Sequence, residues 1–271
     1  RGLGDVYKRQ AQIKVVEDFI SRGVSGIVLA PLDDTALRAP VSNAVRSGIP
    51  VVIIDSGLKS QDYVSFVATD NYKGGYIAGE HLAKLLGAKG KVIMLRYQEG
   101  SASTTEREQG FLDAIKKNPE IEVKSSNQYG GATVETAFQA SENLLAGFKA
   151  SDGSLFIQGI FCPNLSTAFG MLRALQEEGW AGPGKGGIKF VGFDSTDKFL
   201  EALRAGEMDA LILQNPMLMG YLGVKTMIAH LQRKPVEKRI DTGVYLITKE
   251  NMDTPEMKEL LSPDLSKWLK E

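Results

Sequence analysis

Polar side chains stand at the ends of several short apolar segments in this chain. Asp55 ends "PVVIID" (50–55), Asp194 ends "IKFVGFD" (188–194), and Gln214 follows "MDALIL". Arg107 comes shortly after "KVIMLR" (91–96), and Asn164 starts the helical pattern that follows "GSLFIQG". A carboxylate accepts hydrogen bonds from two neighbouring hydroxyls, an arginine donates a planar fork of N–H groups, and amides do both. These residue types suit a neutral polyol.

Short apolar segments alternate with helical patterns, and this order predicts how the polar residues are positioned. Continuous apolar segments predict strands covered on both faces, and helices between them predict parallel sheets. The expected strands are 26–31, 50–55, 64–69, 91–96, 121–128, 153–159, 188–194, 208–215 and a last one near 242–248. The expected helices are 11–22, 33–48, 71–87, 104–117, 133–147, 164–179, 198–207, 216–232 and a tail from 251. Ligands bind such sheets at the carboxyl ends of the strands.

The strand-end residues have a second interpretation, because Asp, Asn and Thr also cap the helices that follow strands. At a single strand end, capping is the better explanation. It weakens when four or five strand ends meet at one crevice, because caps do not require arginine or glutamine. We therefore expect a binding crevice.

Composition excludes several classes of protein. The chain has 271 residues, of which 43% are hydrophobic and 24% charged, and its formal net charge is −1. This balance does not indicate nucleic-acid or membrane-surface binding, and no apolar run reaches the roughly 18 residues of a spanning helix. The single cysteine, Cys162, excludes an internal disulfide; with no base beside it in the sequence, it is expected to be a structural thiol.

Other candidate chemistry is weaker. His81 and His230 lie in helical patterns without a second His or a Cys at metal spacing, so neither a metal nor another cofactor is expected. The glycine-rich "GPGKGG" (182–187) lies between a helix and a strand, which is the wrong place for a phosphate-binding loop. Asp55 and Asp194 could form a glycosidase pair. Surrounding guanidinium and amide donors would keep both ionised, which favours binding over catalysis.

The ordered set of motifs resembles the sugar-binding periplasmic proteins of the ribose-binding type, which feed ABC transporters. The resemblance covers almost everything after residue 10, and no single motif decides it. The matching stretches are "SRGVSGIVLAPLD", "GIPVVIID", "VATDNYKGGYIAGEHLA", "REQGF", "NLSTAFGMLRALQEEG", "KFVGFDST" and "LILQNPMLMGYLGV".

The resemblance implies an α/β fold of two doubly wound parallel-sheet lobes, the periplasmic binding protein type I fold, with the sugar held between lobes that close on it. Three hinge crossings would fall near Thr69–Asn71, Gln214–Pro216 and Asp241–Gly243. The implied lobes are 11–69 plus 215–242, and 70–214 plus 243–271.

The resemblance also implies a ligand-binding set. The positions that match sugar hydrogen-bonding residues are Asp55, Arg107, Asn164, Asp194 and Gln214. Those that match cleft-lining positions are Thr69, Gln98 and Ala132. Ser56 stands where ribose binders have arginine, and Leu165 replaces an acidic residue. These departures indicate a different sugar or a related polyol.

Two functions from different classes remain open on the sequence. The first is an extracytoplasmic binding protein that is monomeric, binds a monosaccharide or polyol, does not bind nucleic acid, and delivers its ligand to a membrane permease. The second is the effector-binding domain of a regulator of the lactose-repressor family, which shares the fold. The stretches "LQNPMLMGYLGV" and "IDTGVYLITKENMD" favour the transport protein. A sugar-processing enzyme is disfavoured.

The opening "RGLGDVYKRQ" has no helical or strand period. In the family, a strand, a helix and a strand, on the order of 50 residues, precede the element that starts at residue 11. We therefore expect residues 1–10 to be non-native and the first lobe to be truncated. A signal peptide and the aromatic residues that stack on the sugar would be lost with that segment. This expectation predicts weak sugar binding.

Overall fold

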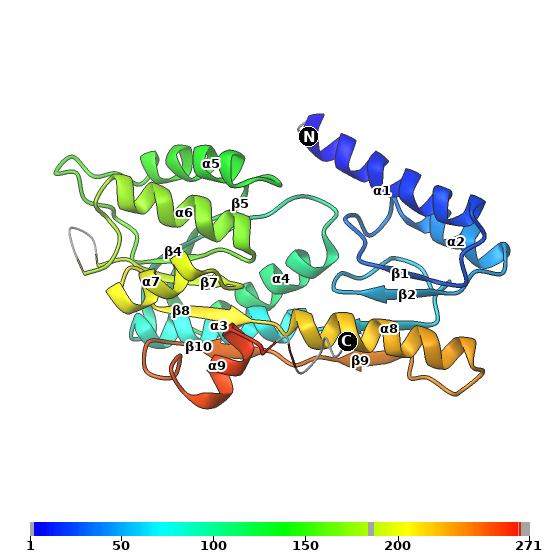
Figure 1. Ribbon diagram of the computed structural model, residues 1–271. Coiled ribbons are helices and arrows are strands. Elements are labelled where there is room, and N and C mark those ends of the chain that lie inside the picture. Colours follow the sequence, from blue (N-terminus) through cyan, green and yellow to red (C-terminus); the bar gives the residue numbers. More distant parts are fainter. Residues whose placement is uncertain (1–2, 184–186, 265, 267–271) are drawn as a thin grey trace. The chain divides into compact units, whose positions relative to one another are not determined.

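The computed structural model describes residues 3–183, 187–264 and 266. The chain forms two compact units, each of α/β architecture (Figure 1). The first unit comprises the residues up to Lys73, Gln98–Arg107 and Gln214–Val244. The second unit comprises Gly74–Tyr97, Glu108–Leu213 and the residues from Tyr245 onward.

A parallel sheet of four strands forms the centre of the first unit, in the order β1-β2-β3-β9. The strands are β1 (Ile27–Leu29), β2 (Val51–Ile54), β3 (Ser65–Ala68) and β9 (Arg239–Asp241). Its helices are α1 (Leu3–Ser21), α2 (Arg38–Arg46) and α8 (Pro216–Leu231). Because alternate strand residues face opposite sides of a sheet, Val51 packs with the cluster of α1 and α2, and Val52 packs with α8. The helices therefore cover both faces (Figure 1).

A six-stranded sheet forms the centre of the second unit, in the order β10-β8-β7-β6-β4-β5. The strands are β4 (Lys89–Arg96), β5 (Glu120–Tyr129), β6 (Gly159–Phe161), β7 (Lys189–Phe193), β8 (Ala210–Leu213) and β10 (Tyr245–Ile247). The remaining helices are α3 (Asn71–Leu85), α4 (Ala102–Lys116), α5 (Val134–Ala146), α6 (Leu165–Glu177), α7 (Asp197–Ala205) and α9 (Pro255–Leu261). Helices α5 and α6 lie over one face of this sheet and α3 lies over the other (Figure 1).

The predicted α/β class with parallel sheets is confirmed, and the structure differs from the expectation in several elements. The edge strand β10 runs antiparallel to β8, so the second sheet is mixed. Strand β9 was not predicted. The strand expected at 153–159 is wrong in position, because the strand that pairs in the sheet is β6, Gly159–Phe161. Gly153, at the start of the expected strand, accepts a hydrogen bond at its carbonyl from the indole N–H of Trp180.

Helix α1 begins at Leu3, eight residues before the expected start at 11. Residues from the opening decapeptide therefore continue the helix, although their sequence shows no helical period. Arg9 contributes a tertiary contact, since its guanidinium lies 3.1 Å from the Asp33 carboxylate in a partly buried ion pair. No helix among the described residues is long and apolar enough to cross a membrane.

The segment 98–107 belongs to the first unit, whereas the resemblance implied that it lies in the second lobe. Hydrogen bonds account for this placement. The Asp34 N–H donates to the Gly100 carbonyl at 2.9 Å, and the Ser103 N–H donates to the Ser56 hydroxyl at 3.1 Å. Both bonds join the start of α4 to loops that follow β1 and β2.

Close backbone approach fixes the packing of α5 against α6. A Cβ on Gly170 would lie 2.5 Å from the backbone nitrogen of Phe138 and 2.6 Å from the carbonyl carbon of Ala137. Backbone atoms cannot rotate away as a flexible side chain can, so a side chain at position 170 would push the two helices apart. Glycine at this position is therefore a packing requirement of the second unit.

We expect Gly170→Ala to lower the free energy of unfolding by about 1–3 kcal/mol, because overpacking forces a backbone shift. Gly147→Ala is the matched control, since Gly147 ends α5 with a helical φ of −68° and its nearest neighbour is the Leu144 carbonyl oxygen at 3.4 Å. Urea denaturation monitored by far-UV circular dichroism measures both. An equal effect of the two variants would contradict the packing role.

Candidate functional site

In the first unit, a buried arginine joins residues that are far apart in the sequence. Arg107 is 2% exposed. Its Nε donates to the Asn71 Oδ1 at 2.9 Å, and its Nη2 donates to the Gln214 Oε1 at 3.2 Å. Arg107 and Gln214 were both predicted as site residues, and the structure brings them into direct contact. Asn71 follows β3, and the sequence analysis placed it only in the hinge crossing implied near Thr69–Asn71.

Asn71 also connects this arginine to the turn at Asp55. The Asn71 side chain is 1% exposed, and its Nδ2 lies 3.5 Å from the Asp55 carbonyl oxygen as a donor. Sequence reasoning did not place Asn71 in the ligand-binding set. The signal that could have found it is its place directly after the expected strand 64–69, where an asparagine also has the second interpretation of a helix cap.

Thr69 binds the segment that follows β9. Its hydroxyl donates to the Gly243 carbonyl at 3.0 Å and lies 3.4 Å from the Thr242 hydroxyl. The guanidinium of Arg239 donates to the Thr69 carbonyl at 3.0 Å and to the Ala68 carbonyl at 2.7 Å. Thr69 was predicted to line the cleft, and the structure shows that its hydroxyl holds the ends of β3 and β9 together.

Two aspartates adopt the same uncommon backbone conformation at equivalent places. Asp55 follows β2 with φ of 65°, and Asp194 follows β7 with φ of 68°. Each N–H still completes the ladder, donating to the Val67 carbonyl at 3.1 Å and to the Ile212 carbonyl at 2.9 Å respectively. The left-handed conformation costs free energy for residues other than glycine, although Asp and Asn tolerate it best. Such strain concentrates at functional sites.

In the second unit, Asp194 and Asn164 meet at the start of α6. The Asp194 Oδ2 accepts from the Leu165 N–H at 3.1 Å. Asn164 caps the helix, because its Oδ1 accepts from the Thr167 N–H at 3.4 Å and from the Thr167 hydroxyl at 2.6 Å. The capping interpretation therefore holds for Asn164. The structure still brings these two predicted residues together.

The remaining predicted positions divide between the units. Gln98 is buried in the first unit, and Ala132 is half-buried in the second, directly after Gly131 with φ of 81°. Ser56, at the position where the resemblance implies an arginine in ribose binders, is buried, and its hydroxyl accepts from the Ser103 N–H. The serine therefore stabilises the first turn of α4.

The alternative chemistry has no geometric support among the described residues. Burial raises the pKa of the Cys162 thiol, which is completely buried and stays protonated, so it is not a nucleophile. Burial lowers the pKa of His81, which leaves the imidazole neutral. The described part of the chain contains no group of three or more His, Cys, Asp or Glu that could hold a metal ion.

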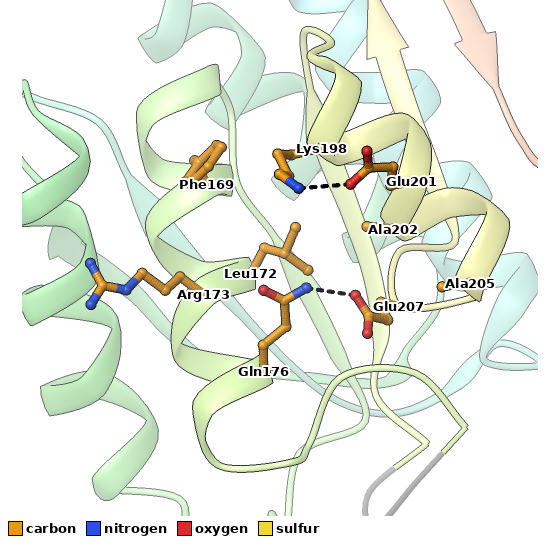
Figure 2. A pocket seen from close by; sticks show the side chains of 9 residues that line it. All are labelled: Phe169, Leu172, Arg173, Gln176, Lys198, Glu201, Ala202, Ala205 and Glu207. Carbon is orange, nitrogen blue, oxygen red and sulfur yellow. Dashed lines mark hydrogen bonds and ion pairs between the residues drawn. The ribbon is translucent and has the colours of Figure 1, made fainter.

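A surface groove of about 410 Å³ lies between α6 and α7 in the second unit (Figure 2). Phe169, Leu172 and Ala202 supply apolar lining. Its polar side chains bind one another, since Lys198 pairs with Glu201 at 2.9 Å and the Gln176 amide donates to Glu207 at 2.6 Å (Figure 2). The groove contains none of the predicted site residues, so we do not assign the ligand to it.

We expect Asp194→Ala to lower the free energy of unfolding by about 1–3 kcal/mol, because alanine is strained at φ of 68° and the Leu165 N–H loses its acceptor. Asp194→Asn should remain within about 0.5 kcal/mol of the wild type, since asparagine tolerates the conformation and offers an amide oxygen. Urea denaturation measures both. Equal stability of the two variants would show that neither strain nor the cap is important there.

Known proteins resemble the chain over most of its length. It is 34% identical over 234 residues to the ribose import binding protein RbsB of Haemophilus influenzae, covering 86% of this chain and 75% of that protein. A carbohydrate transporter solute-binding protein from Agrobacterium radiobacter, in complex with D-arabinose, superposes with a TM-score of 0.85 at 34% identity, covering 94% of this chain and 84% of that chain.

A second solved structure gives the same result. An ABC transporter solute-binding protein from Agrobacterium vitis, with bound D-fucose, has a TM-score of 0.86 at 36% identity and covers 93% of this chain and 84% of that chain. These descriptions name binding proteins rather than enzymes, as expected from the sequence. The periplasmic binding protein domain family matches residues 5–235, and the chain belongs to that family.

Proposed function

We propose that this chain is the substrate-binding protein of an ABC transporter, and that it binds a monosaccharide or a related polyol without changing it. The observation that carries the proposal is the buried arginine of the first unit, held by two side-chain amides beside the strained Asp55 turn. The family supports the same function, since its relatives named above are sugar-binding transport proteins.

The chemistry of these groups suits a neutral ligand with adjacent hydroxyls. A hydroxyl both donates and accepts, so one sugar can donate to a carboxylate and accept from a guanidinium. Bonds to charged partners are stronger than bonds between neutral groups. We propose that Asp55, Arg107, Gln98, Thr69 and Gln214 in the first unit, and Asn164, Asp194 and Ala132 in the second, contribute to ligand binding.

The ligand class is a pentose, a hexose or a related polyol. Of the relatives named above, one is described as a ribose import binding protein, one was solved in complex with D-arabinose and one with bound D-fucose. Ser56 offers no cation at its position, so we propose that this chain makes one charged contact fewer than the ribose binders that carry arginine there. We further propose a monomer that is periplasmic or extracytoplasmic and delivers its ligand to a membrane permease.

Thermal unfolding in the presence of D-ribose, D-arabinose, D-fucose, D-allose or xylitol, up to tens of millimolar, tests the proposal. A ligand that binds only the folded state raises the midpoint in a saturable way, by mass action. We expect this for at least one of these compounds, with NMR spectra of the incubated sugar unchanged. Conversion of the sugar would show an enzyme, and no shift with any compound would contradict sugar binding.

Two variants locate the binding residues. Asp194→Asn should lower the affinity about tenfold or more, because the carboxylate loses its charge while the fold is kept. Arg173→Ala is the control, since Arg173 lines the groove on α6 and lies outside the proposed set. It should bind as the wild type does. Wild-type affinity of Asp194→Asn would remove Asp194 from the site.

A further inference from the structure

Asn71 has the geometry of a residue that acts through another. Its side-chain oxygen accepts from the Arg107 Nε at 2.9 Å, while its nitrogen is directed at the Asp55 carbonyl at 3.5 Å. The orientation of the amide is unambiguous, because a guanidinium only donates and a carbonyl only accepts. The Asn71 amide therefore links two residues that we propose to contact the ligand: the cation Arg107 and, through its backbone, the anion Asp55.

The surroundings of Asn71 hold this amide in place. Asn71 is the first residue of α3, so its backbone is anchored by a helix, and its side chain is 1% exposed. Arg107 is 2% exposed and belongs to α4. Two buried side chains on two helices leave little freedom for the guanidinium plane. Because the N–H groups of arginine form a rigid fork, fixing Nε fixes the directions of the other donors.

The oxygen by which Asn71 holds the guanidinium is neutral. A carboxylate at position 71 would form an ion pair with Arg107 and compete with ligand oxygens. An amide oxygen orients the group without neutralising it. The Gln214 Oε1, at 3.2 Å from the Nη2, does the same on the other arm of the fork.

We propose that Asn71 is a positioning residue that orients Arg107 and thereby sets the chain's discrimination between epimeric sugars. This inference rests on the proposed sugar-binding function. The proposal does not require Asn71 itself to contact the sugar. Its effect is transmitted through the direction of the Arg107 N–H groups, which decides which configuration of a hydroxyl can accept from them.

The test is isothermal titration with D-ribose and D-arabinose, which differ in configuration at one carbon. Asn71→Ala should weaken binding of the preferred sugar about tenfold and bring the ratio of the two affinities toward one. Asn71→Asp, which keeps the shape of the side chain, should also weaken binding, because its charge competes for Arg107. Asn43→Ala is the matched control, since Asn43 accepts from Arg46 on the exposed face of α2 and should change neither value.

A double-mutant cycle separates positioning from a purely structural role. In an Arg107→Lys background, Asn71→Ala should leave the affinity ratio unchanged, because the fork on which it acts is gone. If Asn71→Ala weakens the binding of both sugars equally, and does so again in the Arg107→Lys background, the inference is overturned and Asn71 only stabilises the fold. A wild-type ratio in Asn71→Ala or wild-type affinity in Asn71→Asp would overturn it as well. Failure of the wild type to bind any sugar of the thermal panel would overturn the proposed function, and this inference with it.

Discussion

A buried guanidinium must be surrounded by acceptors, and this requirement organises the residues of the first unit that we propose for ligand binding. Arg107 lies almost completely out of solvent, where an unpaired charge would cost several kcal/mol. Asn71, which follows β3, and Gln214, which follows β8, each provide a side-chain oxygen. The Arg107 side chain therefore binds two parts of the chain that are distant in the sequence. Both oxygens belong to neutral amides, so neither of these two contacts places a negative charge beside the guanidinium.

The second constraint is the backbone at the ends of β2 and β7. Both Asp55 and Asp194 complete a ladder hydrogen bond and then turn through a left-handed conformation. This places a carboxylate at the carboxyl end of a parallel strand in each unit, the edge at which such sheets bind ligands. The same strained geometry therefore recurs in two separate units.

Much of this could be predicted from the sequence. Continuous apolar runs identified most of the strands. The polar residues at or after the strand ends include Asp55, Arg107, Asp194 and Gln214, and the structure shows Arg107 and Gln214 in contact, while their role in ligand binding stays a prediction. The roles of Asn71 and Asn164 were harder to separate, because both read as helix caps and only tertiary contacts show that one of them binds Arg107. The antiparallel direction of β10 and the positive φ values depend on how the chain is routed, which residue type alone does not encode.

NMR spectroscopy of the arginine Nε–H groups, with the Arg107 resonance assigned by its loss in Arg107→Lys, tests whether the ligand binds at this guanidinium. We expect this one resonance to shift during titration with the bound sugar and to reach a limit at saturation, because the ligand's oxygens join the hydrogen bonds of the guanidinium. If a sugar binds to saturation while the Arg107 resonance stays in place, the ligand lies elsewhere and Arg107 is not part of the site.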